Sequence, residues 1–161
     1  MESPVLIQAI SAADVGIARD LFREYQRCIG IDLSFQNFDD ELANLPGEYA
    51  PPAGRLFICL VGEIPGGCVA LRKIDERTCE MKRLYVRSSL RGHRIGRLLA
   101  EKVIQEARTI SYRSMRLDTL PVMTEAIALY RSLGFLPTEA YRLNPHPGAI
   151  YMELPLVPPP L

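Results

Sequence analysis

Cysteine and histidine are too sparse in this sequence for a metal site of the usual kind. The four cysteines, Cys28, Cys59, Cys68 and Cys79, form no Cys-x-x-Cys pair, and only two histidines are present to complete a ligand set. We therefore expect no bound metal. Three of the cysteines fall in apolar strand-like segments, so we expect buried, inert thiols, with a cysteine nucleophile as the less favoured alternative.

The sequence also lacks a long apolar run and an excess of charge of either sign. No stretch approaches the roughly 18 apolar residues of a membrane span, and no basic start precedes an apolar segment at the N-terminus. The formal net charge is zero, which argues against a dedicated nucleic-acid binder. We expect one cytoplasmic domain over residues 1–161, with no membrane and no nucleic acid as partner.

The pattern of apolar residues predicts both strands and helices. Apolar runs predict strands near residues 5–10, 56–61, 68–71, 79–86, 115–119 and 150–154, and spacings of three and four predict helices over 15–29, 38–45, 95–110 and 123–133. The middle strands form an antiparallel meander, and the helix after them is a crossover that places two strands parallel. We expect a mixed α+β fold with a mostly antiparallel central sheet flanked by helices.

The most informative segment is a basic glycine turn that joins a strand to an amphipathic helix over residues 81–99. The first backbone N–H groups of a helix carry the positive end of the macrodipole, and glycine lets a ligand approach the backbone closely. Arg91, His93, Arg94 and Arg97 add side-chain donors at the same place. This junction predicts a site for a phosphate group.

Three separated motifs make the prediction of a phosphate site more specific. They are Glu-x-Lys-Arg-Leu-Tyr-Val at 80–86, Arg-Gly-x-x-Ile-Gly at 91–96 and Ala-Leu-Tyr-x-x-x-Gly-Phe at 128–135. Together they resemble the GNAT superfamily of N-acetyltransferases, closely in the C-terminal half and only by the order of elements in the N-terminal half. In that family the hexad wraps the pyrophosphate of acetyl-CoA, and the strand before it pairs with the pantetheine arm.

The resemblance implies a binding site for acetyl-CoA as co-substrate. Its cofactor-binding residues would be Leu84, Tyr85 and Val86 on the strand and Arg91, Gly92, His93, Arg94, Ile95 and Gly96 in the turn. Arg94 stands where the family most often has glycine, and a backbone contact survives this change if Arg94 has helical dihedrals. Met123 stands near a position where many members carry asparagine.

The resemblance also implies two catalytic residues. Tyr130 would be the general acid that protonates the CoA sulfur, since a phenol with a pKa of about 10 stays protonated at neutral pH. Alternatively, Tyr130 is an ordinary core residue of its helix. Glu80 would be the general base, acting through a water; an ion pair with Lys82, or a water chain as the base, remains an alternative. Backbone N–H groups at 84–86 would hold the oxyanion.

Two further segments bear on the acceptor. The stretch from Cys28 to Gly54 has no lysine or arginine and carries five carboxylates: Asp32, Asp39, Asp40, Glu41 and Glu48. In the family the acceptor-binding elements lie in this region, in or beside which stand the aromatic residues Tyr25, Phe35, Phe38 and Tyr49. This stretch suits a cationic amine, or it is a solvated face over core aromatics. The loop Tyr141 to Gly148 would close over the acceptor, with His146 either as a base or as an exposed loop residue.

These observations predict an N-acetyltransferase that moves the acetyl group of acetyl-CoA to a primary amine by direct attack in a ternary complex. A catalytically silent acyl-CoA sensor of the same fold is the alternative. The acceptor is a small-molecule or peptide amine that the sequence does not specify, and a homodimer is left open.

Overall fold

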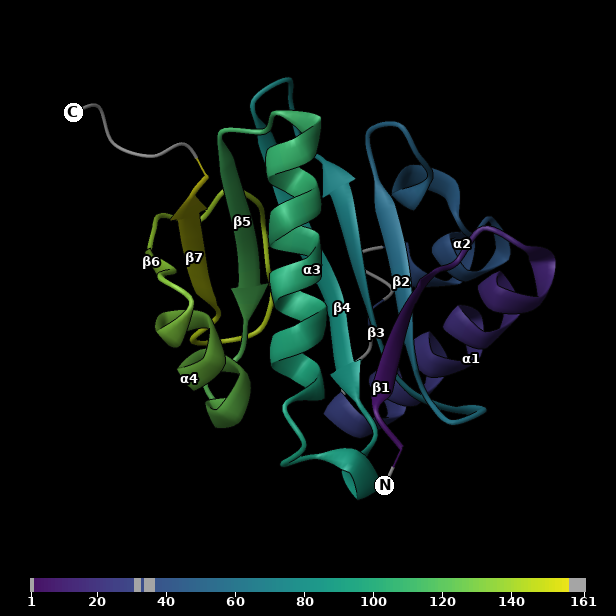
Figure 1. Cartoon of the computed structure of the whole chain (residues 1–161). Coiled ribbons are helices and arrows are strands. Elements are labelled where there is room, and N and C mark those ends of the chain that lie inside the picture. The colour runs from purple at the N-terminus through teal and green to yellow at the C-terminus, as the bar shows by residue number, and fades with distance from the viewer. Residues whose placement is uncertain (1, 31–32, 34–36, 157–161) are drawn as a thin grey trace.

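A seven-stranded sheet in the order β1-β2-β3-β4-β5-β7-β6 forms the centre of the molecule (Figure 1). The computed structural model describes residues 2–30, 33 and 37–156. The strands are β1 (Pro4–Gln8), β2 (Arg55–Val61), β3 (Ile64–Lys73), β4 (Thr78–Val86), β5 (Ser114–Thr119), β6 (Leu136–Pro137) and β7 (Ile150–Pro155). All neighbours are antiparallel except β4 and β5, which are parallel, so the expected mixed sheet is confirmed.

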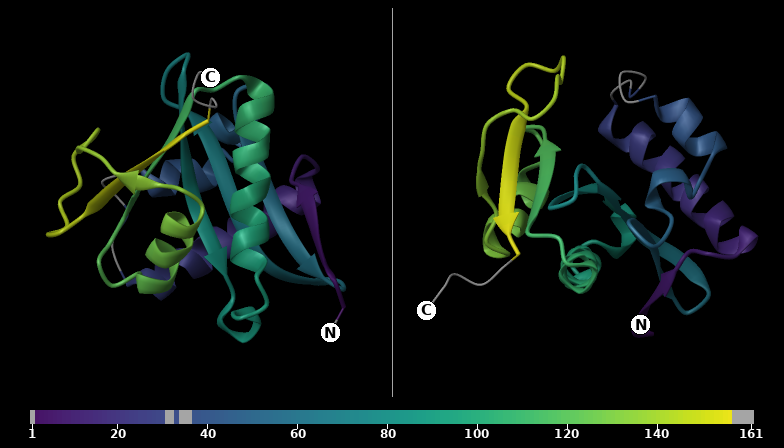
Figure 2. Two further views of the ribbon diagram at one scale, coloured as in Figure 1. Left: turned by 60° about the vertical axis from the view of Figure 1, so that its left-hand side comes forward. Right: turned by 90° about the horizontal axis from the view of Figure 1, so that it is seen from above.

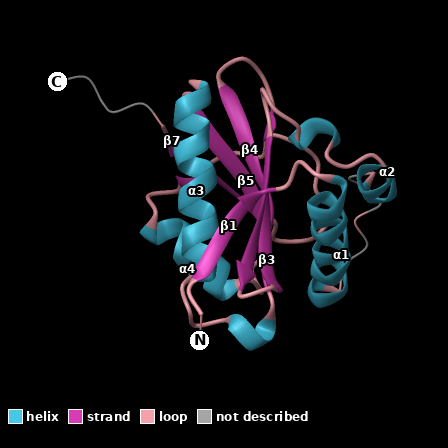
Figure 3. Ribbon diagram, turned by 45° about the vertical axis from the view of Figure 1, so that its right-hand side comes forward, coloured by secondary structure: helices cyan, strands magenta, loops and turns pink. Residues whose placement is uncertain are grey.

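Helices cover both faces of this sheet and enclose two hydrophobic cores. They are α1 (Ala12–Ile29), α2 (Phe38–Ala43), α3 (Ile95–Ile110) and α4 (Thr124–Ser132). Figures 2 and 3 show α3 on one face and α1 with α2 on the opposite face. The start of α1 follows from its sequence, because the Ser11 side chain accepts a hydrogen bond from the Asp14 N–H at 3.1 Å. The described helices include none that is long and apolar enough to cross a bilayer.

The two parallel strands stay paired over only three positions. Thr78, Cys79 and Glu80 of β4 pair with 114–116 of β5, and beyond this point β5 continues beside β7 while β4 continues beside β3. A bulge adds one residue to β4 at the same level: Ala70 pairs with Lys82, but Cys68 pairs with Tyr85. Bulges bend a strand and increase its twist, so the bulge helps to lead β4 away from β5.

Two short helical segments, the two-residue strand β6 and the longer strand β3 differ from the expected elements. The helix expected over 38–45 ends at Ala43, and Gly47–Tyr49 forms a separate 3-10 turn after Pro46; proline cannot continue a helix because it has no N–H. A second 3-10 turn, Ser88–Leu90, precedes the glycine turn and was not predicted. Asp32, Phe35 and the tail from 157 to 161 lie outside the described residues.

Candidate active site

A groove of about 710 Å³ runs along the free edge of β4 to the start of α3. The end of α1 and the start of α4 form its other walls. The predicted cofactor-binding residues lie in its lining: Leu84, Tyr85, Val86, Arg91, Gly92, Arg94, Ile95 and Gly96. His93 is the exception, because it is exposed and does not line the groove.

Backbone groups of β4 and backbone N–H groups of α3 face this groove. β4 has no strand partner on its β5 side after Glu80 among the described residues, so part of its backbone at 81–86 is open to pairing with a ligand. The first turn of α3 carries no side-chain cap, so its N–H groups point outward from the positive end of the helix. Gly92, with a φ of +86°, permits the tight turn between them.

Arg94 does not have the helical dihedrals that we expected for a backbone contact to the cofactor. It is the N-cap of α3 and adopts left-handed dihedrals, φ 64° and ψ 17°, rather than the right-handed helical values expected if its backbone contact is to survive. This conformation costs a side-chain-bearing residue about 1–2 kcal/mol. The chain must reverse here to enter α3, which explains the preference for glycine at this position in the pattern that the turn resembles.

Side chains of α1 and β4 hold the wall of the groove in place. Tyr85 donates a hydrogen bond to Glu24 at 3.3 Å, and Arg87 makes a bidentate ion pair with the same carboxylate at 2.6 and 2.9 Å. The hydrogen bond from Arg87 lowers the pKa of Glu24, against a smaller opposing effect of burial. Cys28 lies 3.5 Å from the Tyr85 hydroxyl, at the edge of the groove.

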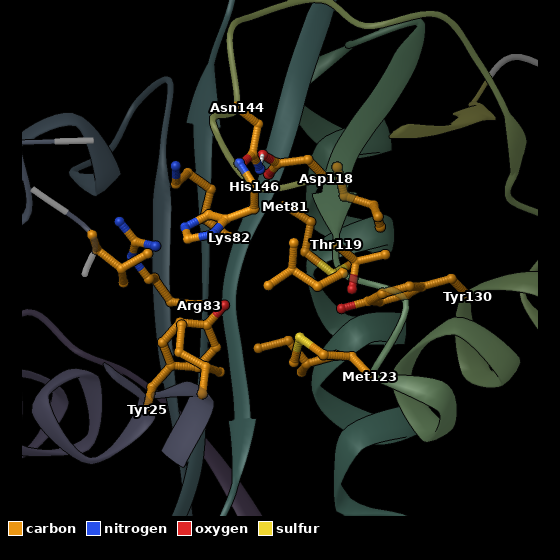
Figure 4. A pocket seen from close by; sticks show the side chains of 15 residues that line it. Tyr25, Met81, Lys82, Arg83, Asp118, Thr119, Met123, Tyr130, Asn144 and His146 are labelled. Atoms are coloured by element: carbon orange, nitrogen blue, oxygen red, sulfur yellow. Dashed lines mark hydrogen bonds between the residues drawn. The ribbon is translucent and has the colours of Figure 1, made fainter. Parts of the chain in front are cut away.

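A small chamber of about 60 Å³ adjoins this groove where β4 and β5 separate (Figure 4). Tyr25, Ile29, Leu84, Leu120 and Met123 line both spaces, so the two lie next to each other. The polar side chains of the chamber come from α1, β4, β5, α4 and the loop before β7: Tyr25, Lys82, Arg83, Asp118, Thr119, Tyr130, Asn144 and His146.

Tyr130 lies at the junction of α4 and this chamber. It is 7% exposed, its ring packs edge-on against Phe135 with centroids 5.8 Å apart, and its hydroxyl points toward the chamber (Figure 4). Burial raises the pKa of Tyr130, and the neighbouring Tyr25 and Asp118 raise it further. The phenol therefore stays protonated at neutral pH and is available as a proton donor.

Glu80 occupies a different place from the one expected for a base. It is fully buried and does not line the chamber. Its carboxylate accepts hydrogen bonds from Arg72 at 2.6 Å and from Tyr141 at 2.5 Å, and it pairs with Arg142 at 2.7 Å. The carboxylate thus joins β3, β4 and the loop before β7, and these three contacts take up most of the lone pairs that a general base would use.

The family of the chain follows from comparison with known proteins. A model of the acetyltransferase (GNAT) family matches residues 18–135. The chain belongs to the GNAT family.

Known relatives and a solved structure agree with this assignment. An uncharacterized N-acetyltransferase of Schizosaccharomyces pombe is 45% identical over 136 residues, which cover 83% of each chain. N-acetylaspartate synthetase of Homo sapiens is 30% identical over 139 residues, which cover 83% of this chain and 43% of that protein. A GNAT family acetyltransferase of Elizabethkingia anophelis with acetyl-CoA bound has the same fold, with a TM-score of 0.69 at 20% identity over 96% of this chain and 99% of that chain. This GNAT protein is accordingly an acyltransferase.

The structure of this GNAT protein adds site residues that sequence reasoning missed. Lys82 is 7% exposed and lines the chamber, and burial, followed by the charge of Arg83, lowers its pKa to about 7. Side chains alternate between the two faces of a strand, which places Lys82 on the same side as Glu80. This alternation was the signal in the sequence that could have identified Lys82. Thr119 was also missed; its buried hydroxyl has no hydrogen-bond partner within the described part of the chain.

Asp118 is a further missed residue, and the loop before β7 holds it. Its carboxylate accepts hydrogen bonds from Arg142 at 2.9 Å and from Asn144 at 3.2 Å. Burial pushes the pKa of Asp118 upward, but the hydrogen bond and charge of Arg142 outweigh it, and the net shift is downward. Through Asn144 and His146 this loop does cover the chamber, so His146 is not merely an exposed loop residue.

The acidic stretch of this GNAT protein is directed at arginines rather than at the chamber. Glu41 accepts two hydrogen bonds from Arg83, both at 2.9 Å, and Glu48 pairs with Arg72 at 3.1 Å. Asp39 and Asp40 are exposed. Glu41 and Glu48 therefore pair with arginines, and none of the described carboxylates of this stretch lines the chamber.

Proposed function

We propose that this GNAT protein transfers the acetyl group of acetyl-CoA to a small primary amine by direct attack within a ternary complex. One observation carries the proposal: a groove that ends at an uncapped helix N-terminus shares five lining residues with a polar chamber, which Tyr130 also lines. A cofactor in the groove and an acceptor in the chamber would meet beside Leu84, which lines both.

The residues of the groove fit acetyl-CoA along its length. The pyrophosphate would accept hydrogen bonds from the first N–H groups of α3 and from the guanidinium groups of Arg91, Arg94 and Arg97. The amides of the pantetheine arm would pair with the free edge of β4, as an added strand pairs with a sheet. The apolar side chains of Leu84, Val86 and Ala126 suit its alkyl segments.

The transfer needs one nucleophile, one set of oxyanion donors and one acid. The neutral amine attacks the thioester carbonyl carbon and forms the C–N bond, while backbone N–H groups at 84–86 stabilise the oxyanion. The C–S bond then breaks, and Tyr130 gives its proton to the departing sulfur. Because Arg72, Tyr141 and Arg142 occupy the carboxylate of Glu80, we assign the amine proton to a water chain and give Glu80 a positioning role.

The chamber favours a small acceptor over a peptide. The loop that carries Asn144 and His146 lines one side of it, and its volume of about 60 Å³ is far below the 710 Å³ of the groove. The name of the human relative, N-acetylaspartate synthetase, shows that an amino acid derivative is made by a related protein. Both observations support a small amine.

The experiment that tests the function is an acetylation assay with a broad amine panel. Purified protein is incubated with acetyl-CoA and each amine, and the acetylated product is measured by mass spectrometry, which avoids interference from the free thiols of the protein. Formation of an acetylated amine and an equal amount of CoA supports the proposal. Binding of acetyl-CoA without turnover of any amine would overturn it in favour of the sensor.

A further inference from the structure

We infer that the hydroxyl of Thr119 is a further substrate contact, which accepts a hydrogen bond from the attacking amine and holds its lone pair toward the thioester. This inference rests on the proposed function. It is carried by a buried hydroxyl that the packing of the described residues leaves unpaired, in a residue that lines the chamber together with Tyr130.

Thr119 is the last residue on the buried face of β5. Met115, Leu117 and Thr119 alternate with less buried residues along this strand. Met115 and Leu117 belong to the hydrophobic core that also includes residues of α3. Valine has nearly the same shape as threonine and is also favoured in strands. The fold therefore does not require a hydroxyl at this position.

The environment of the Thr119 hydroxyl points to a ligand. Thr119 is 6% exposed, and its Oγ1 has no hydrogen-bond partner in any part of the chain that the structure describes. A buried polar group without a partner costs free energy and requires an explanation. Figure 4 shows the Thr119 and Tyr130 oxygens directed at the same part of the chamber, from β5 and from α4. Thr119 thus lies where the thioester and the acceptor would meet.

Of the three reacting groups, the amine is the one that needs a hydrogen-bond acceptor here. In the proposed reaction, backbone N–H groups at 84–86 hold the thioester oxygen, and Tyr130 gives its proton to the sulfur. A neutral primary amine has two N–H donors beside the lone pair that attacks. One would donate to Thr119 and the other to the water chain, and together these two bonds would fix the direction of the lone pair.

The chemical type of the Thr119 side chain suits an amine that must stay neutral. A carboxylate beside the amine would favour the ammonium form, which has no free lone pair. A hydroxyl carries no charge, so it orients the amine with much less effect on its protonation. Asp118 also lines the chamber, but its carboxylate is held by Arg142 at 2.9 Å and by Asn144 at 3.2 Å. Thr119 is therefore better suited than Asp118 to hold the attacking nitrogen.

Two substitutions separate the hydroxyl of Thr119 from its shape. Thr119→Val keeps the size and removes the hydroxyl, whereas Thr119→Ser keeps the hydroxyl. The assay uses acetyl-CoA and the amine that gives the highest kcat/KM in a panel of amino acids, ethanolamine and spermidine. We expect Thr119→Val to lower kcat/KM for this amine by about tenfold or more, and to change the Kd of acetyl-CoA by less than about twofold. Thr119→Ser should keep most of the activity.

A matched control and a second measurement complete the test. Thr109→Val removes an exposed threonine hydroxyl of α3 and should leave kcat/KM unchanged. The second measurement needs no amine: because the Thr119 hydroxyl is buried without a partner, Thr119→Val should raise the midpoint of urea denaturation or leave it unchanged. A gain in stability with a loss of turnover is typical of a group kept for its ligand, and a purely structural residue would lose both.

Several results would overturn the inference while the acetyltransferase function stands. Unchanged kcat/KM in Thr119→Val would show that the hydroxyl does not touch the amine, and an equal loss of acetyl-CoA affinity would place it on the cofactor. Thr119→Ser as inactive as Thr119→Val would assign the effect to the methyl group. A lower urea midpoint in Thr119→Val would give the hydroxyl a structural role. If no amine is acetylated at all, the proposed function itself fails.

Discussion

Glu80 and Arg116 form the last register pair of β4 and β5, and beyond them the two strands are no longer paired. This pair marks the apex of the opening that holds the chamber. Glu80 is buried at the apex, where Arg72 and Arg142 fix its carboxylate. Its contacts tie the sheet to the loop that lines the chamber, and they are the reason for the positioning role that we propose for Glu80.

Replacement of Tyr130 by phenylalanine tests the acid. Tyr130→Phe should lower kcat by about a hundredfold or more, because the departing sulfur loses its proton donor, while the Kd of acetyl-CoA changes by less than about twofold because the groove is unaltered. Tyr112→Phe is the control, since its hydroxyl binds the Ala53 carbonyl at 2.7 Å, away from the chamber. Unchanged turnover in Tyr130→Phe would remove this residue from the mechanism.

A charge reversal tests the phosphate contacts of the glycine turn. Arg91→Glu should weaken CoA by about tenfold or more and leave a pantetheine fragment without the pyrophosphate nearly unaffected. The exposed Arg77, in the turn between β3 and β4, gives the matched control Arg77→Glu. Calorimetry with both ligands measures the difference. An equal loss for the two ligands would show that Arg91 does not contact the phosphates.

The left-handed backbone of Arg94 makes a stability prediction. Without ligand, Arg94→Gly should have a free energy of unfolding about 1 kcal/mol higher than Arg94→Ala, because only glycine adopts a φ of 64° without strain. Urea denaturation of the two variants measures this difference. Both variants should bind CoA more weakly than the wild type, since both lack the guanidinium. Equal stability of the two variants would argue against the left-handed N-cap in solution.

The sequence predicted the groove better than the chamber, and the reason is physical. One wall of the groove comes from a contiguous segment, 84–96, whose strand, turn and helix are set by local pattern. The chamber joins Lys82, Asp118 and Asn144 from three separate segments. Their meeting depends on the short pairing of β4 with β5 and on the bulge at Arg83, and no local periodicity reports either feature.

The acidic stretch is a second example of contacts that the sequence did not predict. Its carboxylates suggested attraction of a cationic amine, but the packing of α2 on the sheet brings Glu41 to Arg83 instead. Arg83 is 4% exposed and also lies 5.0 Å from the centre of the Phe38 ring. A partner 42 residues away in the sequence cannot be assigned from composition, although a buried basic strand residue does require some compensating charge.

The lowered pKa of Lys82 predicts how stability depends on pH. The pKa falls from an ordinary value of 10.5 to about 7 in the folded protein, mainly because the residue is buried. Between these two values the unfolded chain binds more protons than the folded one, so the free energy of unfolding should rise with pH. Urea denaturation at several pH values above 7 should show this rise in the wild type and a smaller one in Lys82→Met.

Lys73→Met is the control for this prediction, because it removes an exposed lysine outside the chamber. This variant should keep the pH dependence of the wild type, since an exposed lysine loses little solvation when the chain folds. If the free energy of unfolding changes with pH equally in the wild type and in Lys82→Met, Lys82 is not the residue that carries the dependence.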